Sequence, residues 1–347
     1  MTHEPRTGAT PIAGALFVRI EVVDESVGPL QPPAPELVHL SRPPSYFSDS
    51  RRNDERTQAS SATRPYIDDM TSRMLPLRFG SQTVLITGAS SGLGAEFARQ
   101  LASRGSTLVL VARREPKLEG LAADLRARYG VTVTTIAADL GKAGAASTLR
   151  SHLEERDVRV TSLINNAGFG TSGAFHEEDP ERVRDEIALN VAALVDLTQS
   201  FIAQLRAGDG FLVNVASVAG YQPTPGFAVY GATKAFVRSF TEAIWAESMG
   251  TGLRVVALSP GPTSTEFFEV AGEDIGSGLP RMTARSVVAI TLRELKRSKP
   301  GPSVVPGPLN TVLTIASKFA PRKPLLRGMS RALGAASHSS QRAPTAT

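Results

Sequence analysis

Three side chains that can share one proton-transfer site stand close together in the sequence: Ser217, Tyr230 and Lys234. Tyr230 and Lys234 are separated by one helical turn in a segment with a helical apolar pattern, so both are expected on one helix face. A nearby ammonium lowers a tyrosine pKa from its usual value near about 10, which suits Tyr230 to general acid/base catalysis. Ser217 ends the apolar run 211–217, a predicted buried strand whose following loop can return the hydroxyl towards Tyr230. Taken alone, this spacing of Tyr and Lys also fits a solvated helix face.

A glycine-rich loop joins the first predicted strand to the first predicted helix. The sequence TGASSGLG places Gly88, Gly92 and Gly94 between the run 81–88 and the helical pattern 93–105. In this context glycines let the backbone turn tightly and approach a pyrophosphate, whose charge meets the N–H groups of the next helix. We therefore expect a dinucleotide site, with a plain glycine-rich turn as the alternative.

Two arginines follow the second predicted strand, which ends at Ala112. An acidic residue at this place would bind a ribose 2′-hydroxyl, whereas Arg113 and Arg114 can accommodate a 2′-phosphate. Ser90 and Ser91 in the glycine loop can donate to the same phosphate. The sequence thus favours NADP(H) over NAD(H), which stays possible; the alternative is that the arginines are ordinary surface residues.

Strand and helix patterns alternate from residue 77 to residue 306. Strands are predicted at 81–88, 106–113, 131–140, 161–168, 211–217, 253–261 and 302–307, and helices at 93–105, 115–130, 142–156, 180–207, 230–248 and 283–298. Short apolar strands separated by helices indicate a parallel sheet with helices on both faces. We predict an α/β fold: a Rossmann-type, doubly wound parallel sheet of about seven strands in a single domain.

Composition excludes several other classes of protein. The chain has no cysteine, which removes disulfides, thiolate nucleophiles and zinc–thiolate sites, and no metal site is predicted. Neither a secretory signal nor an apolar run long enough to span a bilayer is found, so a cytoplasmic location is expected. The net charge of +5 is uneven, because ten Lys or Arg and one Glu lie from residue 293 onward. A basic tail without aromatic interleaving or a reading module does not predict nucleic-acid binding.

In these motifs and their order, the chain resembles the classical short-chain dehydrogenases/reductases over about residues 83–306. The matching segments are the glycine loop Thr87 to Gly94, Asp139 with Leu140, Asn165 to Gly168, Asn190, Ser217, Tyr230 with Lys234, and Pro260, Gly261, Thr263 and Thr265. Each motif is weak alone, but together they are specific. One departure is Ala216 before Ser217, where many relatives have two serines.

The resemblance implies a role for each matching residue. Tyr230 would donate or accept the substrate proton, Ser217 would position the substrate oxygen, and Lys234 would bind the nicotinamide ribose while lowering the tyrosine pKa. Asn190 is added as a fourth catalytic residue that holds a water between Lys234 and solvent. The glycine loop, the arginine pair and the resemblance together give this cofactor-binding set: Gly88, Ser90, Ser91, Gly92, Leu93, Gly94, Arg113, Arg114, Asp139, Leu140, Asn166, Ala167, Gly168, Tyr230, Lys234, Pro260, Gly261, Thr263 and Thr265.

The substrate is expected above the carboxyl ends of the strands, where several loops converge. Besides Ser217, the expected substrate residues are Phe169, Phe227, Phe267 and Phe268, with Phe175, Gln222 and the remainder of 264–280 as further walls. These side chains favour an apolar ligand such as a fatty acyl, steroid-like or aromatic ketone. The alternative is that the aromatics only pack the loops.

The segments outside the alternating pattern are of two kinds. Residues 1–76 are rich in Pro, Ser, Arg and Thr and are predicted to be disordered; Met70 and Met74 suggest an alternative start of translation. Residues 307–347 form a basic tail with two amphipathic patterns, 309–320 and 324–333. The tail is expected to contact a membrane or form a lid; the alternative is docking on the core or on a sister subunit.

The sequence thus predicts an NADP-preferring oxidoreductase that acts on a carbonyl or secondary alcohol. The partner is a small molecule, and the resemblance implies a homodimer or homotetramer. The alternative function is a regulatory protein that binds NADP(H) in the same fold without turnover.

Overall fold

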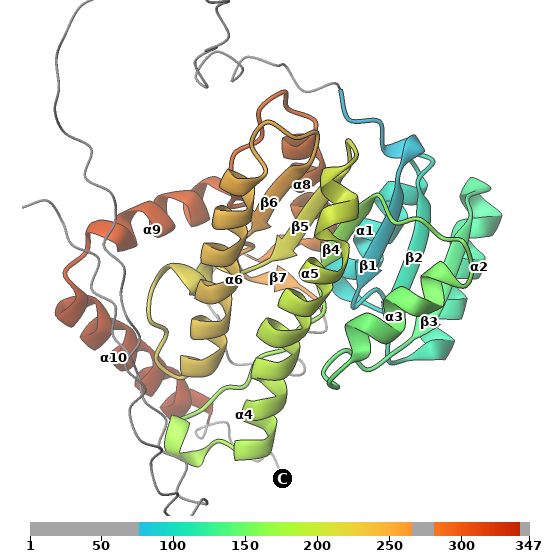
Figure 1. Ribbon diagram of the computed structural model, residues 1–347. Coiled ribbons are helices and arrows are strands. Elements are labelled where there is room, and N and C mark those ends of the chain that lie inside the picture. The colour runs from blue at the N-terminus through green and yellow to red at the C-terminus, as the bar shows by residue number, and fades with distance from the viewer. Residues whose placement is uncertain (1–75, 266–280, 341–347) are drawn as a thin grey trace, which may run out of the picture. The chain divides into compact units, whose positions relative to one another are not determined.

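The computed structural model describes residues 76–265 and 281–340, with side chains described up to residue 331. Its centre is a parallel sheet with the order β3-β2-β1-β4-β5-β6-β9 (Figure 1). The strands are β1 Thr83–Thr87, β2 Thr107–Ala112, β3 Val133–Ala137, β4 Ser162–Asn165, β5 Phe211–Val215, β6 Arg254–Leu258 and β9 Ser303–Val304. The predicted fold class is confirmed. The third strand is shorter than its predicted range, 131–140.

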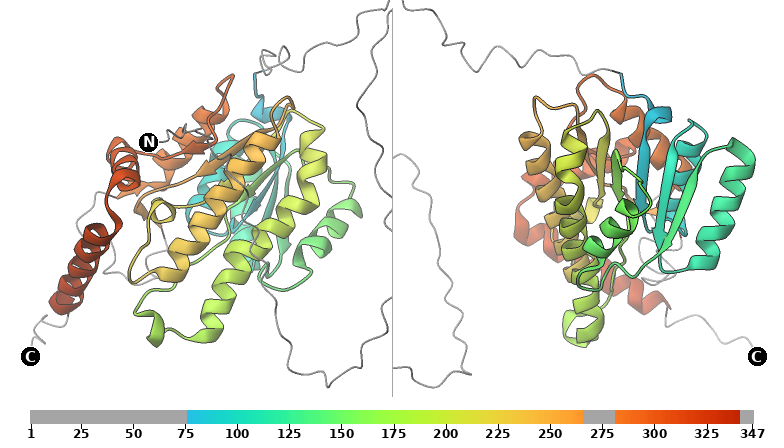
Figure 2. Two further views of the ribbon diagram at one scale, coloured as in Figure 1. Left: turned by 60° about the vertical axis from the view of Figure 1, so that its left-hand side comes forward. Right: turned by 45° about the vertical axis from the view of Figure 1, so that its right-hand side comes forward.

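Two sets of helices cover the two faces of the sheet (Figures 1 and 2). The core of one face comes from α1 Gly92–Ala102, α2 Glu115–Tyr129 and α8 Ala284–Leu295, with Phe97, Leu118 and Val288 fully buried. The other face carries α3 Ala145–Glu154, α5 Ala193–Arg206 and α6 Ala228–Glu247. Because both faces are covered, the strands have apolar side chains on both sides, which explains their continuous apolar runs.

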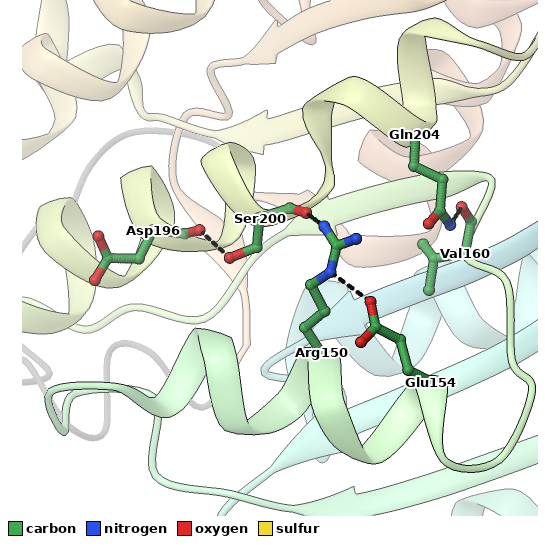
Figure 3. A network of polar contacts seen from close by, with 6 residues as sticks. All are labelled: Arg150, Glu154, Val160, Asp196, Ser200 and Gln204. Carbon is green, nitrogen blue, oxygen red and sulfur yellow. Dashed lines mark hydrogen bonds and ion pairs between the residues drawn. The ribbon is translucent and has the colours of Figure 1, made fainter.

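Helices α3 and α5 are joined by a small polar network above their apolar contact (Figure 3). Arg150 donates to the carbonyl of Ser200 on α5, and its Nε donates to Glu154 Oε1 at 2.7 Å. Gln204 donates to the carbonyl of Val160, which lies just before β4. These bonds fix α5 against α3 and against the segment that leads into the start of β4.

The long apolar helix predicted at 180–207 has a break in its middle. It consists of α4 Pro180–Ile187, a π-helical turn at Ala188–Ala192, and α5. The run Pro180–Arg206 is long and apolar enough to cross a membrane by length and composition. Within the described structure, however, Leu194, Leu197 and Phe201 are buried against the core, and this packing explains the apolar character.

The order in which strands are added to the sheet reverses between β1 and β4, which are neighbours although β2 and β3 lie between them in sequence. The carboxyl ends of these two strands form a topological switch point, the usual place for a ligand in an open α/β sheet. A small second sheet, β7 Thr263–Ser264 with β8 Met282–Thr283, lies beyond β6 and was not predicted.

Short 3-10 turns and two further helices complete the described structure. The turns are η1 Phe79–Ser81, η2 Phe175–Glu177 and η4 Val218–Tyr221, and the helices are α9 Pro308–Phe319 and α10 Arg322–Ser340. Both C-terminal helices were predicted, with Pro321 between them.

Candidate active site

A cavity of about 810 Å³ opens at the switch point and brings the predicted chemistry together. Its walls include Ser217, Tyr230 and Lys234 at one end and the glycine loop at the other. The remaining predicted residues in its walls are Arg113, Arg114, Asp139, Leu140, Asn166, Ala167, Gly168, Pro260, Gly261, Thr263, Thr265, Phe169 and Phe227. Residues from distant parts of the chain thus form one site, as the order of the motifs predicts.

The glycine loop is built by close backbone approach. Gly88 and Gly92 have positive φ angles of 64° and 55°, which glycine adopts without strain. Gly94 does not line the cavity; a β-carbon there would overlap the carbonyl of Gly88 and lie 2.6 Å from Asn166 Nδ2. Asn166 Nδ2 donates to the carbonyls of Thr87 at 2.9 Å and of Gly88 at 3.2 Å. Asn166 therefore holds the loop to the end of β4, and Gly94 lets α1 approach it.

Arg114 lies directly over the two serines of the glycine loop. Its Nη2 donates to Ser90 Oγ at 3.0 Å and to Ser91 Oγ at 2.9 Å. Each serine oxygen accepts from the guanidinium, so the hydroxyl hydrogens can still be donated elsewhere. With exposed Arg113 beside them, these groups form a cationic, donor-rich corner of the cavity. Such a corner fits a phosphate monoester.

Tyr230 and Lys234 lie one turn apart on α6, and Ser217 follows β5. The Lys234 ammonium is 5.7 Å from the centre of the Tyr230 ring and donates to the Val215 carbonyl at 2.8 Å. A side-chain hydrogen bond connects Ser217 and Tyr230. Ser217 Oγ also accepts from the backbone N–H of Ala219 at 3.1 Å, which fixes the serine rotamer.

The tyrosine pKa is raised in this structure, whereas the sequence analysis expected the lysine to lower it. Burial raises the pKa of Tyr230 to about 12; the Ser217 hydrogen bond opposes this shift and the Glu186 carboxylate adds to it. Burial also lowers the pKa of Lys234 to about 8, against the effect of Glu186. The expectation fails because the ammonium points to a backbone carbonyl and loses hydration together with the phenol.

Asn190 lies in the π-helical turn, behind the cavity wall. Its Nδ2 donates to the carbonyl of Phe169 at 2.8 Å, and its Oδ1 accepts from the Phe169 N–H at 3.1 Å. Nδ2 also lies 3.2 Å from Thr233 Oγ1 on α6. The amide thus connects the loop after β4 with α6. A π-helical turn, which is often found at functional sites, presents this side chain.

A buried acidic residue, Glu186, was missed by the sequence analysis. It lies one helical turn before Asn190 and is 0% exposed. Its Oε2 accepts from the N–H and hydroxyl of Thr171 at 2.8 and 2.7 Å, and the same hydroxyl bonds Glu178 Oε2 at 2.9 Å. Burial raises the pKa of Glu186, against the Thr171 hydrogen bonds and the lysine charge. The sequence offered one signal for this residue, because Glu186 stands one helical turn before Asn190 and is therefore expected on the same helix face.

The expected substrate walls are found only in part. Phe169 and Phe227 line the cavity, together with Leu189, Val218 and Arg182, which were not predicted. Phe175 is 63% exposed, and neither it nor Gln222 contributes to the cavity wall. Because Phe175 belongs to the 3-10 turn before α4, its side chain points to solvent instead. Phe267 and Phe268 lie outside the described residues.

Comparisons with known proteins match this architecture. The family described as "short chain dehydrogenase" matches residues 82–276. Sulfoacetaldehyde reductase 2 of Chromohalobacter salexigens is 40% identical over 190 residues, covering 54% of this chain and 75% of that protein. A 7beta-hydroxysteroid dehydrogenase of Collinsella aerofaciens is 34% identical over 182 residues, covering 52% and 68%.

A similar solved structure is the short-chain dehydrogenase from Sphingobium yanoikuyae in complex with NADPH. It has a TM-score of 0.61 and 34% identity, and covers 77% of this chain and 98% of that one. The glycine loop, the seven-stranded order and the cavity end formed by Ser217, Tyr230 and Lys234 agree with the family match. The chain belongs to the short-chain dehydrogenase family of oxidoreductases.

Proposed function

We propose that the protein is an NADP-preferring oxidoreductase that transfers a hydride between the nicotinamide and an apolar carbonyl or secondary alcohol. The observation that carries this proposal is the single cavity shared by the glycine loop and by Ser217, Tyr230 and Lys234. When bound, the nicotinamide supplies or accepts the hydride, and the chain supplies position and proton transfer.

Tyr230 is the general acid/base in this proposal. Burial raises the pKa of its phenol, so the group is protonated at neutral pH and can donate to a carbonyl oxygen as that oxygen gains negative charge. Ser217 orients the same oxygen through its hydroxyl. Lys234 would bind the nicotinamide ribose, as the family resemblance implies, and its ammonium lies 5.7 Å from the centre of the tyrosine ring. Asn190 acts as a positioning residue by holding the Phe169 backbone.

The cavity residues fit a dinucleotide with a 2′-phosphate. A β-carbon at Gly88 would lie 2.8 Å from Asn166 Nδ2 and 2.9 Å from Ala167 Cα, so the glycine loop packs closely on the loop after β4. The N–H groups at the start of α1 would meet the pyrophosphate. Arg113, Arg114, Ser90 and Ser91 would hold the 2′-phosphate. The Sphingobium relative was solved with NADPH, which supports this assignment. NAD(H) would bind without these contacts and therefore more weakly.

The apolar substrate is supported by the cavity walls. Phe169, Phe227 and Leu189 supply apolar surface to the cavity, and the Phe227 ring lies 6.1 Å from that of Tyr230. Phe267 and Phe268 remain part of the proposal as further walls. The Collinsella relative is named for a hydroxysteroid, which agrees with a bulky apolar ligand. Arg182 also lines the cavity, 5.6 Å from the Phe169 ring, so a small anionic aldehyde like that in the name of the Chromohalobacter relative is the competing substrate class.

We also propose, from the family membership, that the enzyme is cytoplasmic and assembles as a homodimer or homotetramer. Size-exclusion chromatography with light scattering tests the assembly. A monomer at micromolar concentration would contradict it.

A panel of carbonyls and alcohols, read at the nicotinamide absorbance with both cofactors, tests the function. The panel should contain a steroid ketone, a long-chain ketone, an aromatic ketone and a small anionic aldehyde. We expect turnover with an apolar ketone and NADPH, and a lower kcat/KM with NADH. Tight NADPH binding without turnover of any carbonyl would instead favour the regulatory alternative.

A further inference from the structure

Helix α9 turns its apolar side away from the protein. Leu309, Val312, Leu313 and Phe319 are 47%, 62%, 47% and 82% exposed, and they follow the helical spacing of a single stripe. The opposite side of α9 buries Thr314 and Ser317 instead. An amphipathic helix that packs on its own protein normally buries its apolar side and exposes its polar side. An exposed apolar stripe of this kind marks an interaction surface.

The inward polar side of α9 is satisfied without a partner from the core. Thr314 Oγ1 donates to the carbonyl of Asn310 at 2.9 Å, and Ser317 Oγ donates to that of Thr314 at 3.0 Å. Thr311 Oγ1 further donates to the carbonyl of Val305 at 3.2 Å, which anchors the start of the helix. Because these hydroxyls are bonded locally, the helix can lie with its polar side inward at little cost.

In the part of the chain that the structure describes with side chains, the charged residues on and after α9 are all basic. Lys318 comes just before Phe319 on α9, and Arg322, Lys323 and Arg327 lie in the first two turns of α10. Figure 1 shows α10 directly after α9. The sequence contains no Asp or Glu from residue 295 to its last residue, 347. A second copy paired symmetrically through this stripe would bring the basic C-terminal segments of the two copies together, and these segments contain no carboxylate side chain. The chemistry that fits is an apolar layer beneath anionic groups, because anionic groups at a bilayer surface attract basic side chains.

The helix also lies next to the active-site loops. α9 contacts η4, the turn that directly follows Ser217. Asn310 packs so closely on Gly261, a cavity residue, that a β-carbon there would overlap its amide. Lys318 Nζ lies 5.7 Å from the centre of the Tyr221 ring in η4. A surface that seats α9 would therefore lie beside the loops that frame the cavity.

We propose that the exposed stripe of α9, with Lys318 and the basic start of α10, is a docking surface for an anionic lipid bilayer. The stripe inserts at the headgroup boundary, and the basic side chains contact lipid phosphates. Docking sets the cavity loops beside the bilayer, from which an apolar ketone can enter. This last step rests on the proposed function, whereas the docking itself does not.

Vesicle flotation of the full chain tests the docking. We expect the protein to float with phosphatidylcholine vesicles that contain phosphatidylglycerol, and to stay in solution with phosphatidylcholine alone. The double variant Val312→Ser/Phe319→Ser should lower the partition coefficient about tenfold or more, since it removes inserted apolar area. The matched control is Met249→Ser, which removes a side chain that is 51% exposed outside the stripe and should float like the wild type.

The basic contribution is tested by Lys323→Gln/Arg327→Gln, which should lower flotation about tenfold at low salt and less at high salt. Arg159→Gln, an exposed cation before β4, is the control. Failure of the wild type to bind anionic vesicles would overturn the proposal. So would binding that survives the stripe variant, or a stripe variant that only lowers the oligomer mass in light scattering, which would assign the stripe to a second copy.

Flotation uses neither cofactor nor ketone. The protein can therefore bind vesicles even if the proposed function is wrong, and it can reduce ketones even if it does not bind vesicles. Turnover of a water-soluble ketone by the stripe variant should equal that of the wild type, which shows that the variant is folded. Turnover of a vesicle-partitioned ketone should fall with the loss of flotation. Equal turnover of the vesicle-partitioned ketone by both proteins would contradict delivery from the bilayer.

Discussion

Arg114 is the side chain on which the proposed preference for NADP depends most directly. Its guanidinium bonds Ser90 and Ser91 and so sets out the corner for a 2′-phosphate. Arg114→Gln should raise the KM for NADPH about tenfold to a hundredfold, since charge-assisted hydrogen bonds contribute roughly 1.5–3 kcal/mol. The KM for NADH should change little. Steady-state kinetics with both cofactors measure these KM values, and the exposed Arg128→Gln is the control. An equal rise of the KM for NADPH and the KM for NADH would contradict the assignment.

Glu186 influences the pKa values of Lys234 and Tyr230 from behind the cavity wall. Its carboxylate raises the pKa of both groups. Glu186→Gln removes this charge, so the pKa of Lys234 should fall from about 8 to a lower value. The pH at which reduction declines, as the ammonium is lost, should then move to lower pH by up to about one unit.

The pH profile of kcat/KM separates this effect from a structural one. Glu177→Gln, at a side chain 72% exposed, is the control and should leave the profile unchanged. Glu186→Asp should restore much of the wild-type profile because it restores the charge. If Glu186→Gln lowered kcat/KM at every pH without shifting the profile along the pH axis, Glu186 would have only a structural role, as the hydrogen-bond partner of Thr171.

At the scale of elements, the contact between the glycine loop and α1 sets the cofactor site. Gly94→Ala places a β-carbon against the carbonyl of Gly88, and the site can accept it only by moving α1. The free energy of unfolding should fall by about 1–3 kcal/mol, and NADPH binding should weaken. Gly120→Ala is the matched control, because nothing lies within 4 Å of its β-carbon on α2. That change should stabilise the protein by about 0.5–1 kcal/mol. Equal effects of the two changes in denaturant unfolding would contradict the account.

The elements also show what the sequence could and could not predict. The strand-loop-helix at residues 81–105 has a local signature, so the cofactor loop was predictable. The π-helical turn under Asn190 was not, because it depends on the packing of the turn against α6 and leaves the apolar pattern almost unchanged. The outward stripe of α9 was predicted as amphipathic, but only the structure shows which side faces the core.

Charge environment was the least predictable feature of the site. The spacing of Tyr230 and Lys234 indicated an ammonium beside a phenol, which is present. The opposite direction of the tyrosine pKa comes from burial and from Glu186, and both depend on the folded arrangement. Local spacing identifies which groups meet, but their hydration is set by the whole core.

At the scale of the whole molecule, we propose that the folded enzyme begins close to residue 77. Leu77 and Phe79 are buried, and the Phe79 ring lies 5.9 Å from that of Phe211 on β5. A chain that starts at Met74 should therefore keep the melting temperature and kcat/KM of the full chain. A chain that starts at Gly80 loses both side chains and should be destabilised by on the order of 3–5 kcal/mol. If the first truncation abolished activity, residues 1–73 would belong to the enzyme.

We propose that Tyr230 performs the proton transfer in a site built for a nicotinamide dinucleotide. The most direct test of this proposal is Tyr230→Phe, measured for NADPH binding by fluorescence and for ketone turnover, with Tyr129→Phe, at a side chain 39% exposed, as control. The account predicts unchanged NADPH affinity and a loss of turnover of about 10²–10⁴-fold. Turnover of Tyr230→Phe close to that of the wild type would contradict it.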